Sequence, residues 1–205
     1  YKYRARKGNK ALYQTHNNKL EILWTSVPAV VLTALIIYGL QTWNNVMMPD
    51  TSKANVMEVY AQQFNWTARY AGEDNQLGRA HYTLIGGVNT LGEDDNDTLT
   101  IDNKIVREIH LPVGEQVLMK FRSQDVIHSA YLPHFNVQMN CVPGMNTQFA
   151  FTPTKTTEEM RKDPEIIQKM KVVNEARAKR GDAPVEFDFV LLCNKICGSA
   201  HYNMQ

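Results

Sequence analysis

The sequence predicts a mainly β domain that follows one membrane-spanning helix and contains one helical insertion. Three features predict this class: an uncharged apolar run over residues 22–40, short alternating segments separated by Pro and Gly after residue 50, and helical periodicity between residues 163 and 181. The 205 residues suffice for one domain of ordinary size and an anchor. The formal net charge of +1 gives no overall field that would attract nucleic acid, so no such partner is expected.

The apolar run has the properties of a transmembrane helix. Nineteen uncharged residues, Ile22 to Leu40, can cross about 30 Å of hydrocarbon. Trp24 lies near one end of this run and Tyr38 and Trp43 near the other, as interfacial aromatic residues do. A core helix or a signal peptide is the alternative, but a signal peptide has a shorter apolar region. Residues 1–20 carry six bases and no acid, which indicates the cytoplasmic side. We therefore expect a basic cytoplasmic segment over 1–20, a transmembrane helix over 21–46 and an extracytoplasmic domain over 47–205.

The rest of the chain is predicted to be an antiparallel sandwich or barrel with one interruption. Strands are expected over residues 57–70, 98–110, 116–122, 125–132, 147–151 and 187–192, and the acidic stretch 72–98 is expected to be a solvated loop. Asp163 and Pro164 form a helix start and Gly181 a helix stop, inside an insertion of about residues 155–182. This amphipathic helix either packs on the domain surface or docks against a partner protein.

The strongest chemical signal is a run of soft metal ligands near the C-terminus. Cys193, Cys197, His201 and Met204 are spaced by four, four and three residues, and His128 stands at the end of a predicted strand far upstream. Thiolate and thioether ligands select copper or iron–sulfur clusters over magnesium or calcium. Two thiolates can bridge two coppers, with one His for each ion and Met204 as a weak axial ligand. The alternatives are a Cys₂His₂ zinc site, which would not use the thioether, a Cys193–Cys197 disulfide, and inert core cysteines.

These residues carry a resemblance to a known family. The motif Cys193-x-x-x-Cys197-Gly-x-x-His201-x-x-Met204, with Asp-Val-Ile-His128-Ser upstream, resembles subunit II of cytochrome c oxidase and its CuA site. The similarity extends over nearly the whole chain: the segment from residue 20 to 29 resembles the start of the family's second transmembrane helix, residues 63–66 its aromatic segment, and residues 111–115 and 142–144 its turns. The double-cysteine loop is the specific part of this match.

The resemblance implies a cupredoxin-like Greek-key domain that holds a dinuclear copper (CuA) centre. It implies Cys193 and Cys197 as bridging ligands, His128 with Met204 on one copper, and His201 with the main-chain carbonyl of Lys195 on the other. It also implies electron transfer from a cytochrome c-type donor to oxidase subunit I. The haem and the CuB copper of that subunit then reduce oxygen to water, coupled to proton pumping. The chain is thus expected to be a subunit of an oxidoreductase and proton translocase.

Three positions depart from the family's usual pattern. Lys195 stands where a Glu usually helps to bind an interface magnesium, and a Lys cannot ligate a cation, so this magnesium site is not expected. Phe64 aligns with the family's electron-entry Trp, which leaves Phe64 and Trp66 as the electron-entry candidates. Asn140 replaces a common acid. With fewer acids near the copper, a fused or tightly bound haem domain becomes a plausible donor beside a soluble cytochrome c.

The remaining expectations concern the anchor and the alternatives. Glu21, at the cytoplasmic end of the span, is either a solvated helix-flanking acid or the entrance of a proton path into the haem subunit. The chain is expected in a bacterial or mitochondrial inner membrane, with the copper domain on the outer side and other oxidase subunits as partners. Rival functions are the copper subunit of a nitric oxide reductase, a nitrous oxide reductase, and a membrane-anchored copper- or zinc-binding module.

Overall fold

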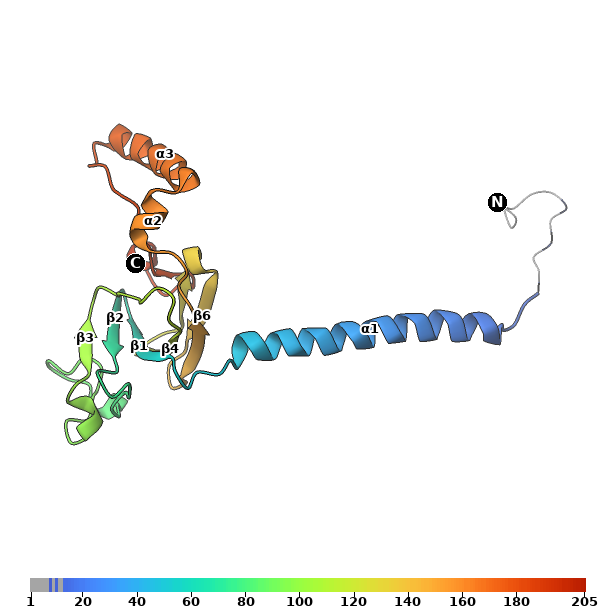
Figure 1. The fold of residues 1–205 in the computed structure, drawn as a ribbon, viewed down its shortest axis with the longest axis horizontal. Coiled ribbons are helices and arrows are strands. Elements are labelled where there is room, and N and C mark those ends of the chain that lie inside the picture. Colours follow the sequence, from blue (N-terminus) through green and yellow to red (C-terminus); the bar gives the residue numbers. More distant parts are fainter. Residues whose placement is uncertain (1–7, 9, 11–12) are drawn as a thin grey trace. The chain divides into compact units, whose positions relative to one another are not determined.

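The computed structural model describes residues 8, 10 and 13–205, and the chain divides into two compact units, residues 1–48 and 49–205. The described part of the first unit contains one long helix, and the second unit contains eight strands and two further α-helices (Figure 1). The predicted class, a mainly β cupredoxin-like sandwich preceded by one apolar helix, is confirmed.

The helix of the first unit, α1, runs from Asn18 to Met47. Asn17 caps its start, since its side chain accepts a hydrogen bond from the N–H of Leu20 and its own N–H donates to Glu21. Its most apolar window has a mean hydropathy of 2.0, and none of that window is buried within the chain. Thirty residues rise about 45 Å along a helix axis, enough to cross a bilayer core even though Pro28, the eleventh residue of α1, lies at the end of its third turn.

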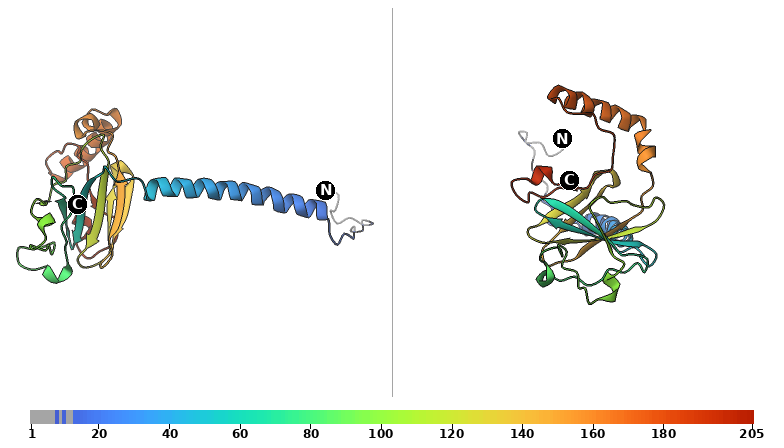
Figure 2. Two further views of the ribbon diagram at one scale, coloured as in Figure 1. Left: turned by 60° about the horizontal axis from the view of Figure 1, so that its bottom comes forward. Right: turned by 90° about the vertical axis from the view of Figure 1, so that its left-hand side faces the viewer.

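The second unit is a sandwich of two sheets (Figure 2). One sheet has five strands in the order β3-β2-β1-β4-β7, and the other has three in the order β6-β5-β8. The strand bounds are β1 Asn55–Gln62, β2 Asn65–Tyr70, β3 Lys104–Val106, β4 Val117–Ser123, β5 His128–Leu132, β6 Val137–Cys141, β7 Thr147–Phe151 and β8 Leu192–Cys193.

Side chains from both sheets form one apolar core. Residues that alternate along β1, β2 and β4 are almost fully buried there, and they meet the inward residues of β5 and β6. Three residues of the soft-ligand motif belong to the same cluster: Cys193, Cys197 and Met204. The candidate metal site is therefore built at one edge of the hydrophobic core rather than in a surface cleft.

Several predicted strands are wrong in extent. Residues 57–70 form a hairpin of β1 and β2 instead of one strand, because the chain turns at Gln63 and Phe64. Residues 98–110 contain only the short β3, preceded by a 3₁₀ turn from Thr98 to Thr100. Strand β6 was not predicted, and of residues 187–192 only Leu192 is in a strand. The strands near 117–123, 128–132 and 147–151 are confirmed.

The acidic loop is only partly the solvated segment that the sequence predicts. Leu91 in this loop is fully buried, and Glu93 reaches the outer face of the five-stranded sheet. There Arg69, which is 1% exposed, contacts Glu58 at 3.1 Å and Glu93 at 2.9 Å. Arg122 completes this charge network through Glu58 at 2.5 Å and through the carbonyl of Leu91 at 3.2 Å. Two acids and two arginines thus fasten the loop to the sheet.

The helical insertion contains two helices, α2 from Thr157 to Arg161 and α3 from Pro164 to Arg180. The predicted signals are confirmed: Asp163 caps α3 by accepting from the N–H of Glu165, and Gly181 ends it with a φ of 80°. Of the apolar residues on α3, only Ile166 is buried, whereas Ile167 is 54% and Val173 43% exposed. Figure 1 shows both helices extending away from the strands.

Gly181 gives a direct test of the helix stop. A Cβ at this residue would meet no atom within 4 Å, so replacement with Ala acts through the left-handed backbone alone. We expect Gly181→Ala to destabilise α3 by about 1 kcal/mol, which corresponds to roughly fivefold faster amide exchange in the helix. Gly86, which also has open space but no positive φ, is the matched control. Equal exchange rates in the two Ala variants would contradict this account of the stop.

Candidate metal centre

The two halves of the site come from different strands that pair with each other. His128 is the first residue of β5, and Cys193 is the last residue of β8. The strands are antiparallel with Ala130 opposite Cys193, so His128, two residues before Ala130, lies on the same face. A loop then returns Cys197 to this point, and a 3₁₀ turn from His201 to Asn203 brings in Met204.

The potential ligand atoms converge closely. Cys193 Sγ lies 3.8 Å from Cys197 Sγ, 3.8 Å from His128 Nδ1 and 3.2 Å from the carbonyl oxygen of Lys195. Cys197 Sγ lies 3.5 Å from His201 Nδ1 and 3.9 Å from Met204 Sδ. The ligand atoms of His128, Cys193 and Cys197 all lie within 4.8 Å of one another. The structure thus brings together all six groups that the sequence singles out as ligands.

Burial affects the pKa of two cysteine thiols, Cys197 and Cys141. Cys197 is 5% exposed, and burial together with the neighbouring Cys193 thiol raises the pKa of Cys197 to about 11. A metal thiolate requires the deprotonated sulfur, so metal binding must release protons. Cys141, the cross-strand neighbour of His128, is fully buried, and burial raises the pKa of its thiol to about 12. It lies in the core as a small apolar residue.

An acid orients His128. Its Nε2 lies 2.8 Å from Oδ1 of Asp125, which leaves Nδ1 directed at Cys193 Sγ. The pKa of Asp125 is lower than usual. Burial alone would raise this pKa, but hydrogen bonds from His128 and from the N–H groups of Gln63 and Val126 stabilise the carboxylate by more than burial destabilises it. A carboxylate behind a metal-binding His fixes the ring and its tautomer. Asp125 is a candidate site residue whose contact with the His128 ring was not predicted from the sequence, although it lies three residues before His128.

The other predicted residues have mixed positions. Trp66 is buried with its ring 6.2 Å from that of His128, and its Nε1 has no hydrogen-bond partner in the part of the chain that the structure describes. Phe64 is half-buried against the cysteine loop, where a Cβ on Gly198 would lie 2.8 Å from its ring. The Lys195 side chain is exposed, so only its carbonyl faces the site. Glu21 lies in the first turn of α1, in the other unit.

This donor set fits copper in number and chemistry. A metal–thiolate bond is about 2.3 Å long, so one ion can contact two sulfur atoms up to about 4.6 Å apart. The separation of 3.8 Å between the two Sγ atoms is within this limit. Two thiols, two imidazoles and a thioether form a soft set. The fold and the site therefore define a class: a membrane-anchored β domain with a buried site suited to a soft metal.

Comparison with known families makes the assignment specific. The family model described as the periplasmic domain of cytochrome c oxidase subunit II matches residues 55–166, and the model of the transmembrane domain of the same subunit matches residues 1–42. The chain belongs to the cytochrome c oxidase subunit II family.

Individual relatives agree with this result. The chain is similar to the alternative cytochrome c oxidase subunit 2 of Bradyrhizobium diazoefficiens, with 30% identity over 100% of this chain and 64% of the relative. It is also similar to cytochrome c oxidase subunit 2 of Cereibacter sphaeroides, with 29% identity over 67% of this chain and 48% of the relative. The chain thus spans between about half and two thirds of the length of these relatives.

A solved structure is also similar. The periplasmic domain of subunit II of cytochrome oxidase from Bradyrhizobium japonicum aligns with a TM-score of 0.41 and 17% identity, over 75% of this chain and 80% of that chain.

Proposed function

We propose that the chain is the electron-transfer subunit of a cytochrome c oxidase and holds a dinuclear CuA centre. One observation carries this proposal: two cysteines, two histidines, a methionine and one carbonyl oxygen converge in a site with sulfur atoms 3.8 Å apart. The family supports a role in an oxidase, and the donor set supports copper. When bound, the copper pair supplies one-electron transfer with little change in geometry.

The proposed roles follow the family resemblance. Cys193 and Cys197 would hold both ions, His128 and Met204 would complete one of them, and His201 and the Lys195 carbonyl would complete the other. His128 and Met204 are almost fully buried, so water is excluded from one side of the site. Low exposure and fixed ligands limit the reorganisation that accompanies a change of charge.

Electrons enter from a cytochrome c-type donor and are passed to the haem of oxidase subunit I. The donor is either a soluble cytochrome c or a fused or tightly bound haem domain. Phe64 and Trp66 are the proposed contacts for entry, since one touches the cysteine loop and the other lies beside His128. The exposed Lys195 ammonium cannot bind magnesium, so no interface magnesium is proposed on this side chain.

The anchor supplies the location and a further proposed role. The transmembrane family match and α1 support a membrane-anchored subunit with a periplasmic domain. We place it in a respiratory inner membrane together with other oxidase subunits. Glu21 is proposed as the entrance of the proton path that couples oxygen reduction to proton pumping; its carboxylate lies in the first turn of α1.

Metal analysis combined with electron paramagnetic resonance tests the proposal. The purified full chain is expected to contain two coppers, and its oxidised form to show one unpaired electron split equally by two copper nuclei. One zinc per chain and no such spectrum would instead support a zinc-stabilised module. In the assembled complex, reduction of oxygen rather than nitric oxide separates an oxidase from a nitric oxide reductase.

A further inference from the structure

We propose that Gln63 is a positioning residue of the metal centre and joins the cysteine loop to the strand that carries His128. The inference rests on the proposed copper function and extends it to a residue that ligates no metal. Gln63 lies at the turn between β1 and β2, in the other sheet from β5 and β8. It therefore connects parts of the site that the sheets alone do not connect.

The side chain of Gln63 contacts the cysteine loop directly. Its Nε2 donates a hydrogen bond to the main-chain carbonyl of Cys197. The next residue of the loop is Gly198, with a φ of +147°, where a Cβ would lie 2.8 Å from Gln63 Nε2 and 2.8 Å from the ring of Phe64. The hairpin turn and the loop are thus packed so closely that only Gly fits between them.

The backbone of Gln63 contacts the histidine side of the site. Its N–H donates to Oδ2 of Asp125 at 2.7 Å, while Oδ1 of the same carboxylate accepts from His128 Nε2 at 2.8 Å and from the N–H of Val126 at 2.7 Å. One residue therefore donates to the main chain of a cysteine ligand and to the acid that orients a histidine ligand. Hydrogen bonds through Asp125 and Gln63 connect His128 to Cys197.

This connection fixes the relative position of ligands that are far apart in the sequence. Nearly seventy residues separate the two ligands, and the β5–β8 pairing involves only two residue pairs, Ala130–Cys193 and Tyr131–Leu192. Cys197, four residues beyond β8, is not held by that pairing. The Gln63 amide supplies the missing constraint, because it fixes the Cys197 carbonyl while the backbone of the same residue fixes Asp125.

A pair of matched variants tests this role in the copper-loaded full chain. Gln63→Met keeps the length of the side chain and removes the donor, whereas Gln62→Met makes the same change one residue earlier, at a side chain with no hydrogen bond in the described part of the chain. Partners that orient metal ligands are typically worth about 10–100-fold in metal affinity. We expect Gln63→Met to release copper to a chelator at least about tenfold faster than the control, and to change the copper hyperfine splitting. Equal release rates and identical spectra would overturn the proposal.

A second measurement separates this proposal from the copper assignment. In the metal-free full chain, Gln63→Met is expected to accelerate amide hydrogen exchange over residues 197–200 relative to Gln62→Met. If the wild type takes up no copper, the proposed function fails, yet exchange still decides whether Gln63 holds the loop. Unchanged exchange would overturn the positioning role. In a double variant with Asp125→Asn, the two effects are expected to be less than additive, because both changes break the same connection.

Discussion

Replacing Cys193 or Cys197 with Ser is expected to eliminate the spectrum of an electron shared by two coppers and to weaken copper binding by at least about 100-fold. A hydroxyl does not ionise in this site and is a hard donor, so it cannot replace a bridging thiolate. The Sγ atoms are 3.8 Å apart, and in the proposed centre both would hold the copper pair, so the loss of either sulfur is expected to affect the whole centre. Copper content, paramagnetic resonance and oxidase turnover measure the effect.

Cys141 is the control for these variants. It is fully buried beside His128 in β6, yet it is not among the residues whose ligand atoms converge in the described chain. Cys141→Ala should keep both coppers and lose about 1 kcal/mol of stability, as expected for removing one buried heavy atom. Full activity after replacement of both Cys193 and Cys197 would contradict the CuA proposal.

The sequence predicts the local features of this protein well. The spacing of Cys193, Cys197, His201 and Met204 identifies the loop because soft ligands that dense are rare by chance, and the structure brings their atoms together. The ends of α3 are also confirmed, since Asp163 and Gly181 act through their own backbone and the next few residues. In both cases the relevant contacts join residues within about a dozen positions of one another in the sequence.

The missed features depend on contacts between distant segments. Nothing near Gln63 in the sequence indicates that its amide reaches Cys197 or that its N–H reaches Asp125. Likewise, residues 57–70 were predicted as one strand because the segment is rich in β-forming and aromatic residues and ends before Gly72. Only the pairing of β1 with β4 and β2 shows where the chain turns.

The charge network on the outer face of the five-stranded sheet belongs to the same missed group. Glu58 and Arg69 face each other across β1 and β2, and the side chain of Arg122, which on β4 is opposite Tyr60, reaches Glu58. Their side chains are between 2% and 17% exposed. Alternation along each strand predicts that these side chains point away from the core, toward solvent. In the structure, however, the segment of residues 91–93 covers them. A face expected to contact water is therefore covered.

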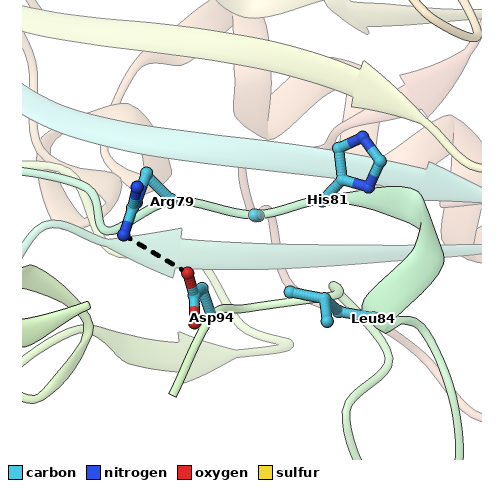
Figure 3. Close-up of a pocket in the computed structure, with 5 residues that line it drawn as sticks. Arg79, His81, Leu84 and Asp94 are labelled. Carbon is cyan, nitrogen blue, oxygen red and sulfur yellow. Dashed lines mark ion pairs between the residues drawn. The ribbon is translucent and has the colours of Figure 1, made fainter. Parts of the chain in front are cut away.

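Arg69→Met is expected to lower the free energy of unfolding by about 3–5 kcal/mol, because it leaves Glu93 and part of Glu58 buried without a cation. The matched control is Arg79→Met in the same loop. Arg79 also pairs with two acids, Asp94 at 3.4 Å and Asp97 at 3.3 Å, but its side chain is 76% exposed beside an open hollow (Figure 3), so its loss should cost about 0–1 kcal/mol.

Urea unfolding of the full chain in detergent measures both variants. If the two variants lost similar amounts of unfolding free energy, the loop would not shield the charges around Arg69 from water. A large loss for Arg69→Met alone, with copper retained at neutral pH, would separate the support of the sheet from the chemistry of the metal site. That outcome is expected because these charges lie on the outer face of β1, β2 and β4, whereas Cys193, Cys197 and Met204 pack with the inward residues of the same sheet.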